Sequence, residues 1–148
     1  METTPYTRKV NYYETDQMGI VHHSNYIRWF EEARVDYMEQ IGFGYHKSVE
    51  AGIDFAVLSV SCVYKSMIRF GDTVQIYMNL STMEPFRMTI EYRVVNTVTG
   101  ELCATGESKH CYYQSFKKRP VSLKKELPEL YKILVEQSPS KIQHEHGI

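Results

Sequence analysis

The stretch "NYIRWFEEARVDYMEQI", Asn25 to Ile41, decides the fold of this chain. Its apolar residues recur at intervals of three and four, which is the period of one face of an α-helix. This face consists of Tyr26, Phe30, Ala33, Tyr37 and Ile41. Three further residues widen it beyond a narrow stripe, namely Ile27, Trp29 and Met38. Gly42 and Gly44 follow, and a glycine commonly ends a helix. We therefore predict a long helix over 25–41 that is enclosed on more than one side.

The segments on both sides of this helix have the composition of strands. A first strand is predicted over Tyr6–Glu14. Four more follow Gly52 and are joined by short turns: "IDFAVLSVSCVY", "GDTVQIYMNLST", "FRMTIEYRVVN" and "ELCATGESKHCYYQSF". In the third of these, alternation predicts one buried face of Phe86, Met88, Ile90, Tyr92 and Val94. A turn or short helix, "YHKSVEA", precedes Gly52, and Pro128 suits the first turn of a closing helix, "PELYKILVEQ".

A single helix with this much apolar surface is buried only if the sheet curls around it. The sequence therefore predicts an α+β fold, a curved antiparallel five-stranded sheet wrapped around a long central helix. With 148 residues, 43% of them apolar, the chain can build one core rather than two. We predict a single domain over 1–137 and a polar tail over 138–148 that includes two of the six histidines.

Charge and composition exclude several classes of function. The net charge is -1, from 17 basic and 18 acidic residues, so the chain has no basic field for a nucleic acid. Its apolar runs are too short to span a bilayer and its first residues lack a signal-peptide core, so we expect a cytoplasmic protein without a membrane span. The three cysteines form no C-x-x-C pair, and we expect them to be reduced. Without an H-E-x-x-H or Cys/His cluster, we expect no metal and no cofactor.

The loop before the long helix, "TDQMGIVHHSNY" from Thr15 to Tyr26, carries the polar residues that could do chemistry. Gly19 lets the backbone turn or approach a ligand closely. The loop leads into a helix N-terminus, where unpaired N–H groups and the helix dipole favour a negative charge. Asp16 could equally form a turn or a cap, and His22 and His23 could be ordinary polar residues. Spacing alone leaves both interpretations open.

A longer stretch around this loop, "YYETDQMGIVHHSNYIRWFEEAR" from Tyr12 to Arg34, resembles the signature of hotdog-fold acyl-CoA thioesterases. The resemblance is to the 4-hydroxybenzoyl-CoA thioesterase type, which includes the tol-pal-associated acyl-CoA thioesterases. The later stretch "YKSMIRFGDTVQI", Tyr64 to Ile76, is similar to a second motif of that family. The resemblance covers about Tyr6 to Pro120 and implies the hotdog fold, a curled sheet around a central helix.

The same resemblance implies a reaction and the residues that perform it. Asp16 would be the catalytic carboxylate, acting as nucleophile or as general base for water. The backbone N–H near His23 would polarise the thioester carbonyl, in an oxyanion site at the helix N-terminus. Gly19 and Tyr26 would contact an acyl-CoA substrate. Basic residues near strand ends would meet its phosphates, and the candidates are Arg87, Lys117, Lys118 and Arg119; an ordinary solvated surface cluster is the alternative for these residues.

Other features of the family pattern concern the pocket, the helix and the assembly. Met18 and His22 depart from the family's usual residues, which bears on the shape of the acyl pocket. Glu31 and Arg34 have the spacing of a structural ion pair on the helix. Family members form dimers or tetramers with sites between protomers, and open sheet edges favour the same outcome, so we expect a homo-oligomer, either a dimer or a homotetramer.

Two other functions remain as alternatives. A hydratase or dehydratase of the same fold would use a different motif, which "HKSVEAG" from His46 does not match. A non-catalytic acyl-CoA-binding module would normally be joined to an output domain, and we expect none here. An acyl-CoA thioesterase is the favoured interpretation.

Overall fold

The computed structural model describes residues 2–138, so all but the first residue of the predicted polar tail lies outside the described residues. Its elements in chain order are β1 (Tyr6–Lys9), a 3-10 turn η1 (Tyr12–Glu14), α1 (Ser24–Gln40), α2 (Tyr45–Ala51), β2 (Ile53–Tyr64), β3 (Thr73–Met83), β4 (Arg87–Asn96), β5 (Leu102–Gln114), β6 (Arg119–Pro120), α3 (Leu123–Glu126) and α4 (Pro128–Glu136). None of the described helices is long and apolar enough to cross a membrane.

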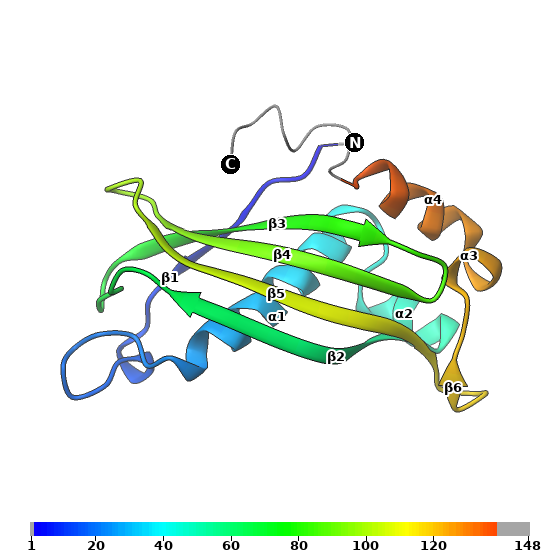
Figure 1. The fold of residues 1–148 in the computed structure, drawn as a ribbon, viewed down its shortest axis with the longest axis horizontal. Helices are drawn as coiled ribbons and strands as arrows, with labels where there is room; N and C mark the ends of the chain where they lie inside the picture. Colours follow the sequence, from blue (N-terminus) through cyan, green and yellow to red (C-terminus); the bar gives the residue numbers. More distant parts are fainter. Residues whose placement is uncertain (1, 139–148) are drawn as a thin grey trace.

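The predicted sheet and its central helix are both present. The strands lie in the order β1-β3-β4-β5-β2 with antiparallel pairing throughout, and α1 runs along one face of the sheet (Figure 1). Register shifts place an extra residue in β2, β3 and β5, and such bulges bend a strand. The curled antiparallel sheet around the helix is the hotdog arrangement that the sequence predicts. A sixth strand that the sequence did not indicate, the two-residue β6, pairs with β5.

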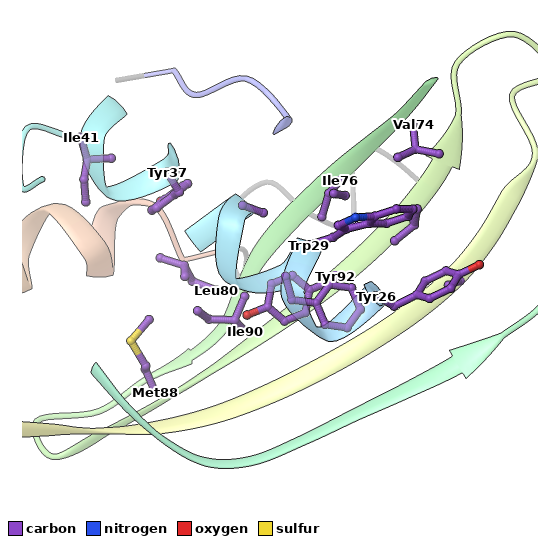
Figure 2. Close-up of a cluster of buried hydrophobic side chains, with 14 of the residues drawn as sticks. Tyr26, Trp29, Tyr37, Ile41, Val74, Ile76, Leu80, Met88, Ile90 and Tyr92 are labelled. Atoms are coloured by element: carbon purple, nitrogen blue, oxygen red, sulfur yellow. The ribbon is translucent and has the colours of Figure 1, made fainter. Parts of the chain in front are cut away.

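The core lies between α1 and the inner face of the sheet, where Figure 2 shows helix aromatics against β3 and β4. Trp29 and Phe30 are fully buried, and the Phe30 ring stacks on Tyr92 at 4.2 Å between centroids. Gly106 on β5 makes room for this ring, because a Cβ there would stand 2.4 Å from Phe30. Each such large apolar side chain contributes about 1.5–3 kcal/mol by leaving water.

Two details of the strand prediction were wrong. The first strand ends at Lys9 rather than Glu14, because the chain turns into η1, where the Asn11 N–H donates to the Glu14 carboxylate at 2.8 Å. In the strand "FRMTIEYRVVN", the inner face holds Met88, Ile90, Tyr92 and Val94 as predicted. Phe86 precedes β4, however, and its side chain is 53% exposed.

Candidate active site

The loop from Thr15 to Val21 is a closed turn that fixes the Asp16 carboxylate. The Asp16 N–H donates to the Ile20 carbonyl at 2.9 Å, and the Gly19 N–H donates to the Asp16 carbonyl at 2.9 Å. Gly19 has φ of +76°, a conformation that suits a residue without Cβ. Asp16 Oδ1 accepts the Met18 N–H at 2.8 Å, which is an Asx turn. Its Oδ2 has no hydrogen-bond partner among residues 2–138, and the residue is exposed.

The entry to α1 offers an unpaired backbone donor at His23. The His22 ring accepts the Ser24 N–H at 3.2 Å, and the His22 carbonyl accepts the Asn25 N–H at 3.0 Å. These contacts satisfy the first N–H groups of the helix, which otherwise lack partners. The His23 N–H, one residue before α1, has no hydrogen-bond acceptor within the described part of the chain. It is therefore available to a ligand.

Asp16 and His23 line one pocket of about 350 Å³. The rest of its wall comes from the loop, from α1 and from the segment that follows β2: Ile20, Val21, Tyr26, Tyr64, Lys65, Ser66, Met67 and Ile68. A carboxylate and an unpaired backbone N–H that belong to two residues lining one small cavity could bind a carbonyl group and attack it.

Tyr64 at the end of β2 has a place in this site that sequence reasoning did not assign. Its hydroxyl donates to the His23 carbonyl at 3.1 Å, and its ring meets the Tyr26 ring edge-on at 4.9 Å. Burial raises the pKa of both tyrosines, so both hydroxyls are neutral at neutral pH. Tyr64 opens the second motif of the family resemblance, which was the available signal for it.

The predicted site residues do not all converge within one chain. Asp16, His23 and Tyr26 line the pocket, and Gly19 shapes the turn beside it. The pocket lies at the end of the sheet where Tyr64 pairs with Ala104 of β5. Arg87 pairs with Cys111, further along β5. The Lys117 N–H donates to the side chain of Gln114, the last residue of β5. Because β5 is extended, Gln114 lies about 30 Å from Ala104. Arg87, Lys117, Lys118 and Arg119 thus lie toward the opposite end of the sheet.

The predicted Glu31–Arg34 ion pair is absent from residues 2–138. Arg34 instead donates to the Tyr92 hydroxyl at 3.0 Å, because its side chain reaches into the core beside β4 rather than along the helix surface. The three ion pairs of the described chain are Arg8–Glu14, Arg8–Glu32 and Lys117–Glu126. Among the same residues no group of three His, Cys, Asp or Glu side chains could hold a metal ion.

Comparison with protein families identifies the superfamily of this chain. Residues 10–131 match the model of the thioesterase-like superfamily. The chain belongs to this superfamily. It is a thioester hydrolase with the hotdog fold, as the sequence predicted. The finer assignments to the 4-hydroxybenzoyl-CoA type and to the tol-pal-associated group remain predictions.

Individual members of the superfamily align along most of the chain. A protein of Bacillus subtilis named "Putative acyl-CoA thioesterase YneP" is 30% identical over 121 residues, which is 82% of this chain and 87% of that protein. The crystal structure of the DHNA-CoA thioesterase from Staphylococcus aureus superposes with a TM-score of 0.85 at 26% identity, over 98% of this chain and 95% of the other. A structure of a Thermus thermophilus protein, TT1821, gives a TM-score of 0.83 at 31% identity, over 91% and 99%.

Proposed function

We propose that the chain hydrolyses an acyl-CoA thioester to a free acid and CoA, with Asp16 as the attacking or proton-accepting group. The observation that carries this proposal is that Asp16 and His23 line the same pocket, and that the His23 N–H has no hydrogen-bond acceptor within residues 2–138. A thiol of pKa about 8.5 is a good leaving group, so the reaction needs an attacking group and an oxyanion donor more than it needs a general acid.

Two reaction pathways are compatible with the Asp16 carboxylate and the His23 N–H. In the first, Asp16 Oδ2 attacks the thioester carbon, the carbonyl oxygen becomes an oxyanion that accepts the His23 N–H, and the C–S bond breaks to release CoA thiolate. Water then hydrolyses the mixed anhydride and restores the carboxylate. In the second, Asp16 takes a proton from a water molecule whose oxygen attacks the same carbon. The C–S bond then breaks to release CoA thiolate, and the proton on Asp16 passes to the thiolate or to solvent. The Asx turn is compatible with both pathways because it holds Oδ1 and leaves Oδ2 without a hydrogen bond to residues 2–138.

The decisive experiment follows free thiol release from a panel of aliphatic and aryl acyl-CoA esters, for the parent and for Asp16→Asn. Asparagine keeps an oxygen that accepts the Met18 N–H, so the turn is retained while the charge is lost. We expect a folded variant with kcat at least about a hundredfold lower. Asp36→Asn is the matched control, because its oxygen can still accept the Gln40 amide and it lies outside the pocket.

Two results would reject the proposal. Equal turnover by the parent and Asp16→Asn would remove Asp16 from the mechanism. Binding of acyl-CoA without hydrolysis of any ester in the panel would favour a non-catalytic acyl-CoA-binding module.

The proposal includes a homo-oligomer in which the edge strand β2 pairs with its copy. β2 pairs with β5 on one side only and has no partner on the other among the described strands. Its side chains Val57, Leu58 and Val63 are half exposed or more. A long apolar edge of this kind is normally covered. Dimers, alone or as halves of a tetramer, would be detected by light scattering, and a monomer at micromolar concentration would count against this assembly.

Antiparallel pairing of two β2 strands would also account for the distant basic residues. The 115–118 turn is bonded to the start of β2, since the Ser115 N–H donates to the Gly52 carbonyl at 2.8 Å. The pocket adjoins the other end of the strand, at Tyr64. Antiparallel pairing would therefore carry the partner's Lys117 and Lys118 toward this pocket, where CoA phosphates could meet them.

We also propose a cytoplasmic location. All three cysteines are free, Cys103 is buried, and the burial of Cys62 raises its thiol pKa. Unpaired thiols are typical of a reducing compartment.

A further inference from the structure

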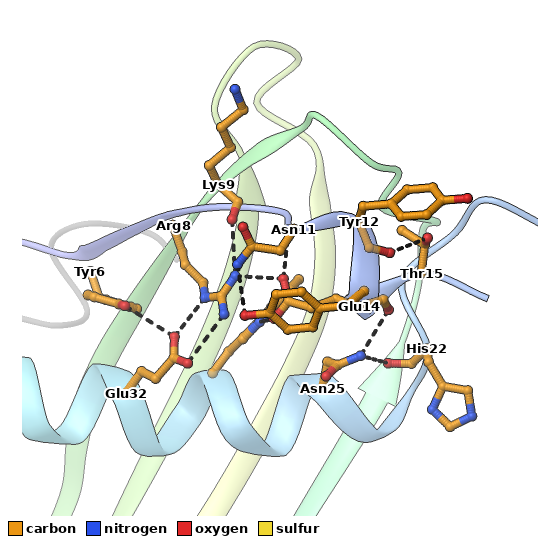
Figure 3. Close-up of polar contacts among 12 residues, drawn as sticks. Tyr6, Arg8, Lys9, Asn11, Tyr12, Glu14, Thr15, His22, Asn25 and Glu32 are labelled. Atoms are coloured by element: carbon orange, nitrogen blue, oxygen red, sulfur yellow. Dashed lines mark hydrogen bonds and ion pairs between the residues drawn. The ribbon is translucent and has the colours of Figure 1, made fainter.

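The Glu14 carboxylate is buried beneath the Asp16 loop and is fully hydrogen-bonded (Figure 3). Its Oε1 accepts from Arg8 Nη1 at 2.6 Å and from the Asn11 N–H at 2.8 Å, and its Oε2 accepts the Trp29 indole N–H at 2.9 Å. The donors come from β1, from the start of η1 and from the middle of α1. The side chain of Glu14 thus joins three segments immediately before the candidate catalytic loop.

The backbone carbonyl of Glu14 closes that loop. It accepts the His22 N–H at 2.8 Å and the Asn25 side-chain amide at 2.9 Å. Between the closing residues lie the Thr15–Val21 bridge and the Asp16 turn. Residues 14 and 22 form the stem of this loop. Glu14 holds the stem through its backbone carbonyl, and its side-chain carboxylate is itself anchored by three donors. Asp16 lies two residues from one end of the stem, and His23 lies next to the other.

Arg8 holds the carboxylate from the other side and is itself fixed. Its Nε donates to Glu32 Oε1 at 2.7 Å, and its guanidinium lies 5.4 Å from the centre of the Trp29 ring. Burial disfavours the charged guanidinium, but hydrogen bonds to Glu32 and Glu14 outweigh it and raise the pKa of Arg8. Arg8 is thus charged at neutral pH and provides a cationic partner for Glu14.

We infer that Glu14 is a positioning residue for thioester hydrolysis, which fixes the separation between the Asp16 carboxylate and the His23 N–H. The inference rests on the proposed function. Glu14 lies outside the set of residues that line the pocket, so it acts through the loop rather than on the substrate. An error of about 1 Å in the placement of reacting groups can cost on the order of a hundredfold in rate. A carboxylate that accepts from three donors and a carbonyl that accepts from two are a means of preventing that error.

The test compares Glu14→Gln with Glu32→Gln. Glutamine at position 14 keeps the size of the side chain, but its amide must turn N–H groups toward at least one of the donors that the carboxylate accepts. Glu32 also binds Arg8, and it accepts the Tyr6 hydroxyl, but its hydrogen bonds join β1 to α1 and do not involve the described loop residues 15–22. We expect Glu14→Gln to lower kcat about tenfold or more with KM changed less than about twofold, and Glu32→Gln to retain parental kcat.

Backbone amide exchange provides a readout that needs no activity. The N–H groups of Asp16 and His22 are protected by the loop's hydrogen bonds, and we expect both to exchange faster in Glu14→Gln than in Glu32→Gln. A purely structural Glu14 would lower the folded fraction and leave kcat per folded molecule unchanged, which overturns the inference. A fall in kcat with unchanged loop exchange also overturns it.

The two proposals fail separately. If the parent hydrolyses no ester, the proposed function fails and amide exchange alone decides whether Glu14 positions the loop. If Asp16→Asn is inactive while Glu14→Gln has parental kcat, only the positioning role fails.

Discussion

Protonation of His110 should destabilise the fold because this histidine ends a buried chain of hydrogen bonds. Arg34 Nη1 donates to the Tyr92 hydroxyl at 3.0 Å, Tyr92 contacts Ser108 Oγ at 2.6 Å, and Ser108 contacts His110 Nε2 at 2.7 Å. The other ring nitrogen, Nδ1, lies 3.3 Å from the Phe55 carbonyl. One arrangement of protons satisfies every group: each hydroxyl donates to the next member, Nε2 accepts, and Nδ1–H donates. A protonated ring would direct a second N–H at Ser108 and leave a hydroxyl donor without an acceptor.

The magnitude follows from the pKa of His110. Burial, followed by the nearby charge of Arg34, lowers this pKa from 6.5 to about 4. The unfolded chain binds a proton near pH 6.5 and the folded chain only near pH 4, so stability is complete above about pH 7 and is lost as the pH falls toward 4. The loss amounts to about 2 kcal/mol at pH 5 and about 3 kcal/mol once the pH is below both values.

Urea denaturation at pH 7 and at pH 5 measures this loss, with His110→Gln as the reference. The other described histidines, His22, His23 and His46, are exposed and cancel in the comparison. The parent should lose about 2 kcal/mol more than the variant between the two pH values. If the variant does not fold, NMR titration of the His110 ring in the parent gives the same information. A ring pKa at or above 6.5, or equal losses in parent and variant, would refute the reasoning.

Two further predictions concern the core and the pocket. Gly106→Ala should lower the free energy of unfolding, measured by urea denaturation, by about 1–3 kcal/mol, because the new Cβ would stand 2.4 Å from the Phe30 ring. An unchanged midpoint of urea denaturation would show that the ring moves aside without cost. Tyr64→Phe removes the donor to the His23 carbonyl and should lower kcat/KM about two- to tenfold, which is the equivalent of one net hydrogen bond. The melting temperature should change little, because Tyr64 is 47% exposed. Full activity of the variant would exclude a role for this hydroxyl.

The fold was predictable because its central element has a strong local signal. The predicted helix over 25–41 corresponds to α1 at Ser24–Gln40, and its wide apolar surface required a curled sheet. The end of the first strand was not predictable, because Tyr12 and Tyr13 favour strands by composition. What turns the chain there is the burial of Glu14 against Arg8 and Trp29, and Trp29 is fifteen residues away in the sequence.

The candidate site could be proposed from the sequence only in the part that is local in sequence. Asp16 and His23 belong to one loop, so a single motif contains both. Tyr64 reaches the site from β2, across 41 residues, and nothing in its own segment indicates that its hydroxyl bonds to the His23 carbonyl. The basic residues show the limit more clearly, since charge and strand position suggested them while the register of β5 separates them from Asp16.

The two interpretations of Asp16 that the sequence left open are compatible in the structure. The turn uses Oδ1 and the backbone of Asp16, whereas the proposed chemistry uses Oδ2, so one residue can do both. The two neighbouring histidines also differ in their contacts: the His22 ring accepts the Ser24 N–H at the helix entry, whereas the His23 N–H has no acceptor within residues 2–138. Since the turn requires only a side-chain oxygen, asparagine satisfies it, and the proposed catalysis is the role of Asp16 that would require its charge.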